Sequence, residues 1–160
     1  MVPPQDKLAG ALYNFKGVKR RFSYRIKSND LVLIDDYAHH PTEIAAVHQA
    51  IREMHPGKRV LAIFQPHLFS RTKDFVDDFA AVLSRFDKVR LLDIYPAREL
   101  PVEGVTSDWL LGKINNNNKK RISRDQLSEE IKQSKCEVIV MMGAGDIGEM
   151  VQKVEKELKK

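Results

Sequence analysis

The stretch Leu31-Val32-Leu33-Ile34-Asp35-Asp36-Tyr37-Ala38-His39-His40-Pro41 joins an apolar run to a dense group of polar side chains. The apolar run is typical of a strand that is buried on both faces of a parallel sheet. Pro41 suits the first position of a helix, because its fixed φ matches the helix and its missing N–H needs no partner there. The stretch therefore predicts a strand, a polar turn and a helix, the repeating unit of an α/β fold.

Similar, near-continuous apolar runs occur three more times, at Val60–Phe64, Val89–Ile94 and Val138–Met142, with Arg90 and Asp93 as the only interruptions. Helical patterns lie between or after these runs, at Ile44–Met54, Phe75–Phe86, Ser107–Ile114, Ser123–Ile131 and Ile147–Leu158. The alternating segment Arg21–Lys27 is expected to form an edge strand, and Lys120–Ile122 a short strand. We therefore predict an α/β fold with a doubly wound, mostly parallel six-stranded Rossmann-like sheet and an antiparallel edge strand.

The composition indicates one soluble domain. The chain has 160 residues, of which 42% are hydrophobic and 31% charged, and it contains no apolar run long enough to span a membrane. The single cysteine, Cys136, excludes an internal disulfide and suits a reducing cytoplasm, so we expect a cytoplasmic protein. The net charge of +5 is scattered rather than gathered with stacking aromatics, which argues against a nucleic acid partner.

Gly143, Gly145 and Gly148 match the G-x-G-x-x-G pattern of dinucleotide-binding folds. No second strand follows and no acidic residue lies about twenty residues further on, so the dinucleotide interpretation fails on position. Two alternatives stay open: a helix N-terminus that binds an anion, or a tight turn that needs glycine. The sequence also lacks the G-x-x-x-x-G-K-[ST] pattern, so the chain cannot hold the phosphates of ATP by itself in the usual way.

Four residues that could form a metal site follow the predicted strands, namely Asp36, His39, His40 and His67. Adjacent histidines do not easily reach one ion, and the His-x-x-x-His spacing is missing, so we predict no metal ligands. Arg71 and Arg98 each lie beyond a strand, where a guanidinium group can bind a carboxylate or a phosphate. A solvated surface position is the alternative for both arginines.

Four motifs resemble the C-terminal domain of the Mur ligase family, in the family's order: Asp35–Glu43, Phe64–Thr72, Tyr95–Glu99 and Met142–Asp146. Each motif alone is weak, but the four together are highly specific. The resemblance runs from about Gly17 to the end of the chain. It implies that residues 17–160 form the amino-acid-binding and nucleotide-closing domain, and that residues 1–16 are a residual interdomain linker.

The resemblance implies an ATP-dependent carbon–nitrogen ligase of peptidoglycan synthesis, with L-alanine, ATP and UDP-N-acetylmuramate as partners. In such enzymes ATP converts a carboxylate to an acyl phosphate, which the alanine amine attacks. The phosphate loop and the Mg²⁺ belong to a central domain outside this chain, so we expect the isolated chain to be inactive. Two alternatives stay open, namely the related ligase that recycles a muropeptide tripeptide and a stand-alone nucleotide-binding module.

The resemblance also implies roles for individual residues. Arg21 would contact the nucleotide, and Asp36 would accept hydrogen bonds from its ribose. The residues implied around the amino acid and the reacting phosphate are Tyr37, His39, His67 and Arg71, with His39 and Arg71 catalytic, and Arg98, Gly143, Gly145 and Asp146 further along the pocket. Leu68 departs from the family, which often has an arginine there, so Arg71 is expected to hold the alanine carboxylate.

Overall fold

The computed structural model describes residues 9–10, 13 and 18–159. Six strands of this part of the chain form one sheet in the order β1-β2-β6-β3-β4-β5. They are β1 Ser23–Lys27, β2 Val32–Asp36, β3 Val60–Phe64, β4 Lys88–Leu91, β5 Lys119–Arg121 and β6 Val138–Met142. β1 pairs with β2 in antiparallel orientation, and all other pairs are parallel. The predicted mostly parallel sheet with an antiparallel edge strand is confirmed.

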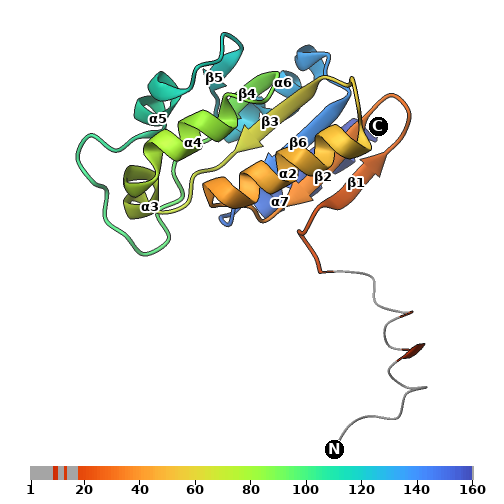
Figure 1. The fold of residues 1–160 in the computed structure, drawn as a ribbon, viewed down its shortest axis with the longest axis horizontal. Coiled ribbons are helices and arrows are strands. Elements are labelled where there is room, and N and C mark those ends of the chain that lie inside the picture. The colour runs from red at the N-terminus through yellow and green to blue at the C-terminus, as the bar shows by residue number, and fades with distance from the viewer. Residues whose placement is uncertain (1–8, 11–12, 14–17, 160) are drawn as a thin grey trace, which may run out of the picture.

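Helices cover both faces of the sheet, as Figure 1 shows. On one face lie α2 (Pro41–Met54), α4 (Val76–Leu83) and α5 (Ser107–Lys113), and on the other α6 (Leu127–Ser134) and α7 (Ile147–Leu158). Two short elements, α3 (Phe69–Asp74) and the 3-10 helix η1 (Arg124–Gln126), precede α4 and α6. The sheet is therefore doubly wound, as predicted.

Alternation along the central strands creates two separate cores. In β2, Val32 and Ile34 belong to the core on the α2 side, whereas Leu33 belongs to the core on the α7 side. Every residue of β3 and β6 is buried. Because helices exclude water from both faces, these strands need apolar residues at successive positions. This burial explains the continuous apolar runs of the sequence.

The element boundaries confirm some local signals and correct others. Pro41 is the first residue of α2, as predicted. β2 extends through Asp36 rather than ending at Ile34, because its ladder with β6 continues to that residue. The helix predicted at Phe75–Phe86 corresponds to α4, which spans Val76–Leu83, and a short helix that was not predicted, α3, precedes it. The two are separated at Phe75, which leaves the helical region at φ −116° and ψ 22°. Because α3 is short and mostly polar, it has no apolar stripe that would indicate a helix.

The C-terminal half shows similar shifts. β4 ends at Leu91 instead of Ile94. The predicted capping box is present, with Ser123 N donating to Gln126 Oε1 at 3.0 Å, but it opens η1 rather than α6 directly. The linker predicted at residues 1–16 lies outside the described residues, apart from residues 9–10 and 13. Within the described part of the chain, no helix is long and apolar enough to cross a membrane.

Candidate functional site

Aromatic and charged side chains gather where β2, β3 and β4 end. Because these strands run parallel, their carboxyl ends meet at one edge, which is where ligands bind in open α/β sheets. Four rings form a row there, with centroids separated by 5.2 Å (Tyr37 to His39), 6.0 Å (His39 to His67) and 5.7 Å (His67 to Tyr95). We call these four residues the ring row. Three of them, Tyr37, His39 and His67, are predicted site residues, and the fold brings them together.

His39 is oriented by the first turn of α2. Its Nδ1 lies 2.9 Å from the carbonyl oxygen of Tyr37 and 3.3 Å from Glu43 Oε2. Both oxygens are acceptors, so Nδ1 carries a proton, and the neutral ring presents Nε2 as an acceptor. Burial raises the pKa of Glu43, but the N–H groups of His39 and His40 and nearby positive charge outweigh it and lower that pKa below its usual value. His39 therefore presents a lone pair at Nε2, on the side of the ring away from Tyr37 O and Glu43.

The adjacent His40 has a different role, at the start of α2. It is the N-cap residue, and its Nδ1 accepts from Thr42 N at 3.5 Å. In return, Glu43 Oε2 accepts from His40 N at 3.2 Å. The ring of His40 lies 4.6 Å from that of Phe75. Across the described residues, no group of three or more His, Cys, Asp or Glu side chains is placed to hold a metal ion.

Arg71 reaches back from α3 to His67. Arg71 Nη1 lies 3.2 Å from His67 Nδ1. Arginine is always a donor, so His67 Nδ1 accepts and its Nε2 carries the proton. Burial lowers the pKa of His67, and the charges of Arg71 and His39 lower it further. The neutral form is therefore favoured, and His67 offers an N–H donor where His39 offers a lone pair.

The position of Arg71 is fixed by contacts at the N-terminal end of α3. Leu68, the N-cap, has a φ of 72°, in the left-handed region that residues other than glycine rarely adopt. Its N–H donates to the carbonyl oxygen of Tyr95 at 2.9 Å. Ser70 donates to Glu99 from its N–H at 3.0 Å and from its hydroxyl at 2.5 Å. These bonds tie the helix to the loop that follows β4.

Asp36, predicted to hold a ribose, accepts two backbone hydrogen bonds. Its Oδ1 accepts from Ala38 N at 2.7 Å and its Oδ2 from Phe22 N at 2.6 Å, and only 5% of the residue is exposed. The carboxylate therefore braces the loop after β2. Asp36 and Arg21 border a hollow of about 350 Å³ that is otherwise lined mainly by apolar residues, which suits a nucleoside. The roles of Asp36 and Arg21 toward a nucleotide stay predictions.

The three glycines of the G-x-G-x-x-G pattern make room for neighbouring groups. A Cβ at Gly143 would lie 2.8 Å from the carbonyl oxygen of Gln65, and a Cβ at Gly145 would lie 2.5 Å from Gln65 Oε1. A Cβ at Gly148 would lie 2.7 Å from Arg20 Cζ. Gly143 also has a φ of 151°, which side chains disfavour. Each of the three glycines therefore leaves space for a different neighbouring group.

The side chain of Gln65 occupies the N-terminus of α7. Gln65 Oε1 accepts from Ile147 N at 3.1 Å, and its Nε2 donates to Asp146 Oδ1 at 2.7 Å. Asp146 Oδ2 pairs with Arg124 Nη2 at 2.6 Å. Because the Ile147 N–H already has a partner within the chain, the geometry favours the tight turn over the anion site. The roles of Asp146 and the glycines in a ligand pocket stay predictions.

Arg98 is exposed and has no hydrogen bond or ion pair to another described residue, so its role as an anion fork stays a prediction.

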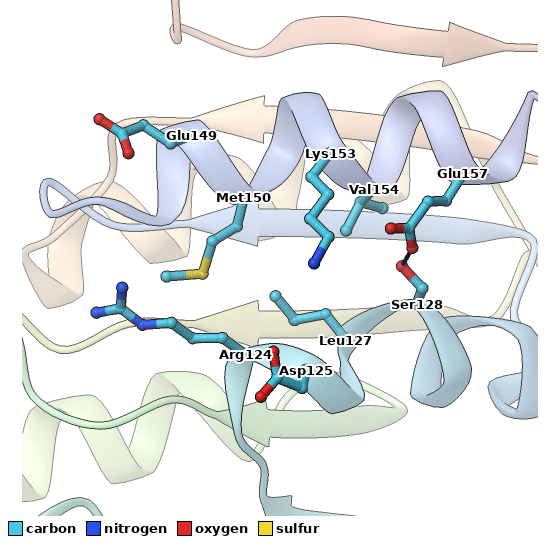
Figure 2. Close-up of a pocket in the computed structure, with 9 residues that line it drawn as sticks. All are labelled: Arg124, Asp125, Leu127, Ser128, Glu149, Met150, Lys153, Val154 and Glu157. Carbon is cyan, nitrogen blue, oxygen red and sulfur yellow. Dashed lines mark hydrogen bonds between the residues drawn. The ribbon is translucent and has the colours of Figure 1, made fainter.

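A second hollow, of about 390 Å³, lies beside η1, α6 and α7. Figure 2 shows Met150 and Lys153 of α7 reaching toward Leu127 across this hollow. No predicted site residue lines it.

Four side chains that are not predicted as site residues complete the site: Arg20, Glu43, Gln65 and Tyr95. Tyr95 ends the ring row, Gln65 holds the turn before α7, and Glu43 orients His39. The guanidinium of Arg20 lies 5.2 Å from the centroid of the Tyr37 ring. The pair Arg20-Arg21 is visible in the sequence, but residue type alone does not show which arginine is held within the protein and which borders the hollow.

The fold and the ring row define an open α/β domain with a polar site at the carboxyl edge of a parallel sheet, an arrangement typical of nucleotide- and substrate-binding domains. The chain belongs to the Mur ligase family. The family model "Mur ligase, glutamate ligase domain" matches residues 20–145.

Similar proteins include a UDP-N-acetylmuramate–L-alanine ligase from Christiangramia forsetii, 72% identical over 151 residues that are 94% of this chain and 33% of that relative. A crystal structure of UDP-N-acetylmuramate–alanine ligase from Thermotoga maritima matches with a TM-score of 0.71 at 25% identity, covering 96% of this chain and 35% of that one. A domain from a proposed UDP-N-acetylmuramate:L-alanyl-γ-D-glutamyl-meso-diaminopimelate ligase of Haemophilus ducreyi matches with a TM-score of 0.60 at 25% identity, covering 86% of this chain and 99% of that one. The chain therefore spans about a third of the curated relatives it matches.

Proposed function

We propose that this chain is the C-terminal domain of an ATP-dependent ligase that joins L-alanine to UDP-N-acetylmuramate in peptidoglycan synthesis. The 72% identity to a ligase of that name supports the choice of acceptor amino acid. In this proposal residues 17–160 bind the amino acid and close over the nucleotide, and residues 1–16 are an interdomain linker. The enzyme acts in the cytoplasm.

The observation that carries the proposal is the convergence of His39, His67 and Arg71 at the ends of β2 and β3. The 6.0 Å between the two imidazole centroids and the 3.2 Å between Arg71 Nη1 and His67 Nδ1 bring two imidazoles and a guanidinium close together, which supports the roles of base, donor and cation. A zwitterionic amino acid needs those three groups. Its carboxylate needs a cation, and its ammonium must lose a proton before it can attack.

In this reaction Arg71 binds the alanine carboxylate through its guanidinium fork. His39 Nε2 accepts the proton from the ammonium group, while the Nδ1 contacts to Tyr37 and Glu43 keep the ring in the required tautomer. His67 donates from Nε2 to the carboxylate or to the reacting phosphate. These groups act by orienting the amine and by removing its proton, so the chain supplies position and proton transfer.

In this proposal the nucleotide binds at the hollow beside Arg21 and Asp36. Its apolar lining by Ala46, Val47 and Ala50 suits a base, and Arg21 lies at its border. ATP supplies the phosphoryl group that converts the carboxylate of UDP-N-acetylmuramate to an acyl phosphate. Mg²⁺ is held by a part of the protein outside this chain. Arg98 and the turn Gly143–Asp146 would complete the wall of the pocket.

The test is phosphate release by the purified full-length protein with ATP, Mg²⁺ and UDP-N-acetylmuramate. We expect release that depends on L-alanine, and none from the isolated 160-residue chain. Release that depends instead on the tripeptide L-alanyl-γ-D-glutamyl-meso-diaminopimelate would assign the protein to the recycling ligases. Tight ATP binding by the isolated chain, with no ligation by the full-length protein, would assign it to nucleotide-binding modules.

A further inference from the structure

Arg20 joins three parts of the site that are distant in the sequence. Its Nη2 donates to the carbonyl oxygen of Gly143 at 2.6 Å, and its Nε donates to Asp35 Oδ1 at 3.1 Å. Its guanidinium lies 5.2 Å from the Tyr37 ring centroid, within reach of a cation–π interaction. Its own carbonyl oxygen accepts from Tyr37 N at 2.7 Å. One residue thus connects the loop after β2 to the turn after β6.

This arrangement includes several features that oppose stability. Arg20 has a φ of 58°, a left-handed conformation that is unfavourable for a residue with a side chain. Its guanidinium also packs against Gly148, in the first turn of α7, where the positive end of the helix dipole disfavours a cation. Burial raises the pKa of Asp35 above its usual value, although the hydrogen bond and charge of Arg20 act against it. Strain of this kind concentrates at functional sites.

The neighbouring Arg21 has a different environment. More than half of its side chain is exposed, it approaches Glu43 at 3.7 Å, and it borders the hollow proposed for the nucleotide. The side chain of Arg20 is less than half as exposed, at 24%, and contacts protein groups on several sides. The guanidinium of Arg21 also lies 5.9 Å from the Tyr37 ring centroid, so the two arginines differ in burial and in hydrogen bonds: only Arg20 bonds both Asp35 and the Gly143 carbonyl oxygen.

We infer that Arg20 is a positioning residue, which holds Tyr37 and the Gly143 turn so that the ring row keeps its geometry without Arg20 touching the substrates. The effect passes through Tyr37, whose ring contacts His39 at 5.2 Å between centroids. The inference rests on the proposed function for its kinetic consequence, but its structural part is independent of the reaction.

The test compares four variants of the full-length protein: Arg20→Met, Gly148→Ala, the double variant, and the control Lys19→Met. Gly148→Ala keeps the charge of Arg20 but displaces its guanidinium, since the new Cβ would lie 2.7 Å from Cζ. Alanine is otherwise favoured over glycine in a helix, so a loss cannot come from helix propensity. Lys19 is an exposed neighbouring cation and controls for the loss of charge.

We expect kcat/KM to fall roughly tenfold or more in each single variant, because small displacements of positioned groups reduce rates strongly. The kcat/KM of the double variant should be no lower than that of the more impaired single variant, because both changes disrupt the same contact. Lys19→Met should behave as wild type. Hydrogen exchange should accelerate at residues 37–40 and 143–147 in Arg20→Met and Gly148→Ala only.

Two results would overturn the inference. One is a lower melting temperature with unchanged kcat/KM per folded enzyme and unchanged exchange at these segments, which is the pattern of a purely structural residue. The other is multiplicative losses in the double variant. If wild-type protein does not ligate L-alanine, the proposed function fails, while the exchange measurements still decide the role of Arg20. If Arg20→Met does not fold, Gly148→Ala and Arg20→Lys provide the same comparison.

Discussion

Gly145→Ala should destabilise the chain, and the structure gives the size of the effect. The new Cβ would lie 2.5 Å from Gln65 Oε1 and 2.8 Å from Tyr95 Cβ. Gln65 cannot move aside freely, because its amide bonds both Ile147 N and Asp146 and only 1% of the residue is exposed. Overpacking of this kind costs about 1–3 kcal/mol, and a lost hydrogen bond adds about 1 kcal/mol. We expect a total loss of about 2–4 kcal/mol.

The matched control is Gly112→Ala in α5. A Cβ at Gly112 would meet nothing within 4 Å, so the same chemical change should stabilise the chain by up to about 1 kcal/mol through helix propensity. Urea denaturation of the 160-residue chain, followed by circular dichroism, measures both changes. Opposite signs support the packing argument. Equal effects at Gly145 and Gly112, or a Gly145 variant as stable as wild type, would refute it.

Three further predictions concern the site. Arg71→Lys in the full-length enzyme should raise the KM for L-alanine about tenfold, because lysine lacks the planar fork, and leave the KM for ATP nearly unchanged; the reverse pattern would assign Arg71 to the phosphate. Since the pKa of His67 is lowered by burial, then by Arg71 and His39, the unfolded chain binds more protons. Stability should therefore decline as pH falls below the ordinary histidine value of about 6.5, more steeply than in His67→Gln, and identical profiles in pH-dependent denaturation would contradict this. Asp36→Asn should lower the free energy of unfolding by about 1–3 kcal/mol, because an amide side chain cannot accept hydrogen bonds from both backbone N–H groups. The same variant should bind ATP more weakly. Lower stability with unchanged ATP affinity would limit the role of Asp36 to bracing the loop.

The sheet and the centre of the site could be predicted because they follow from patterns that act locally. Continuous apolar runs indicate strands buried on both faces, and parallel strands bring their carboxyl ends to one edge. Those two facts place His39 and His67 at the same edge of the sheet, although they do not bring the two rings into contact. The helix α3 could not be predicted in this way, because its six residues are mostly polar and carry no apolar stripe.

Other features depend on which atoms meet in three dimensions. Residue type indicates that Asp36 is an acceptor, but the sequence does not show that its donors are the N–H groups of Phe22 and Ala38. Arg20 and Arg21 are the same residue type in adjacent positions, and the sequence does not show that Arg20 adopts a left-handed backbone and is the more buried of the two. The G-x-G-x-x-G pattern is misleading for a similar reason. Its three glycines make room for Gln65 and Arg20, yet they have the spacing that is typical of a dinucleotide site.

β6 lies between β2 and β3 in the sheet, yet it contributes no side chain to the ring row. Strands are about 4.8 Å apart, so β2 and β3 are separated by about twice that distance, and their loops must lean inward for two imidazoles to meet. The turn after β6 lets the loops that follow β3 and β4 lean toward β2, because Gly143 and Gly145 leave space for Gln65 and Tyr95. Divergence of substrate preference can therefore proceed by exchange of the flanking loops while the sheet is retained, provided that this central turn stays small.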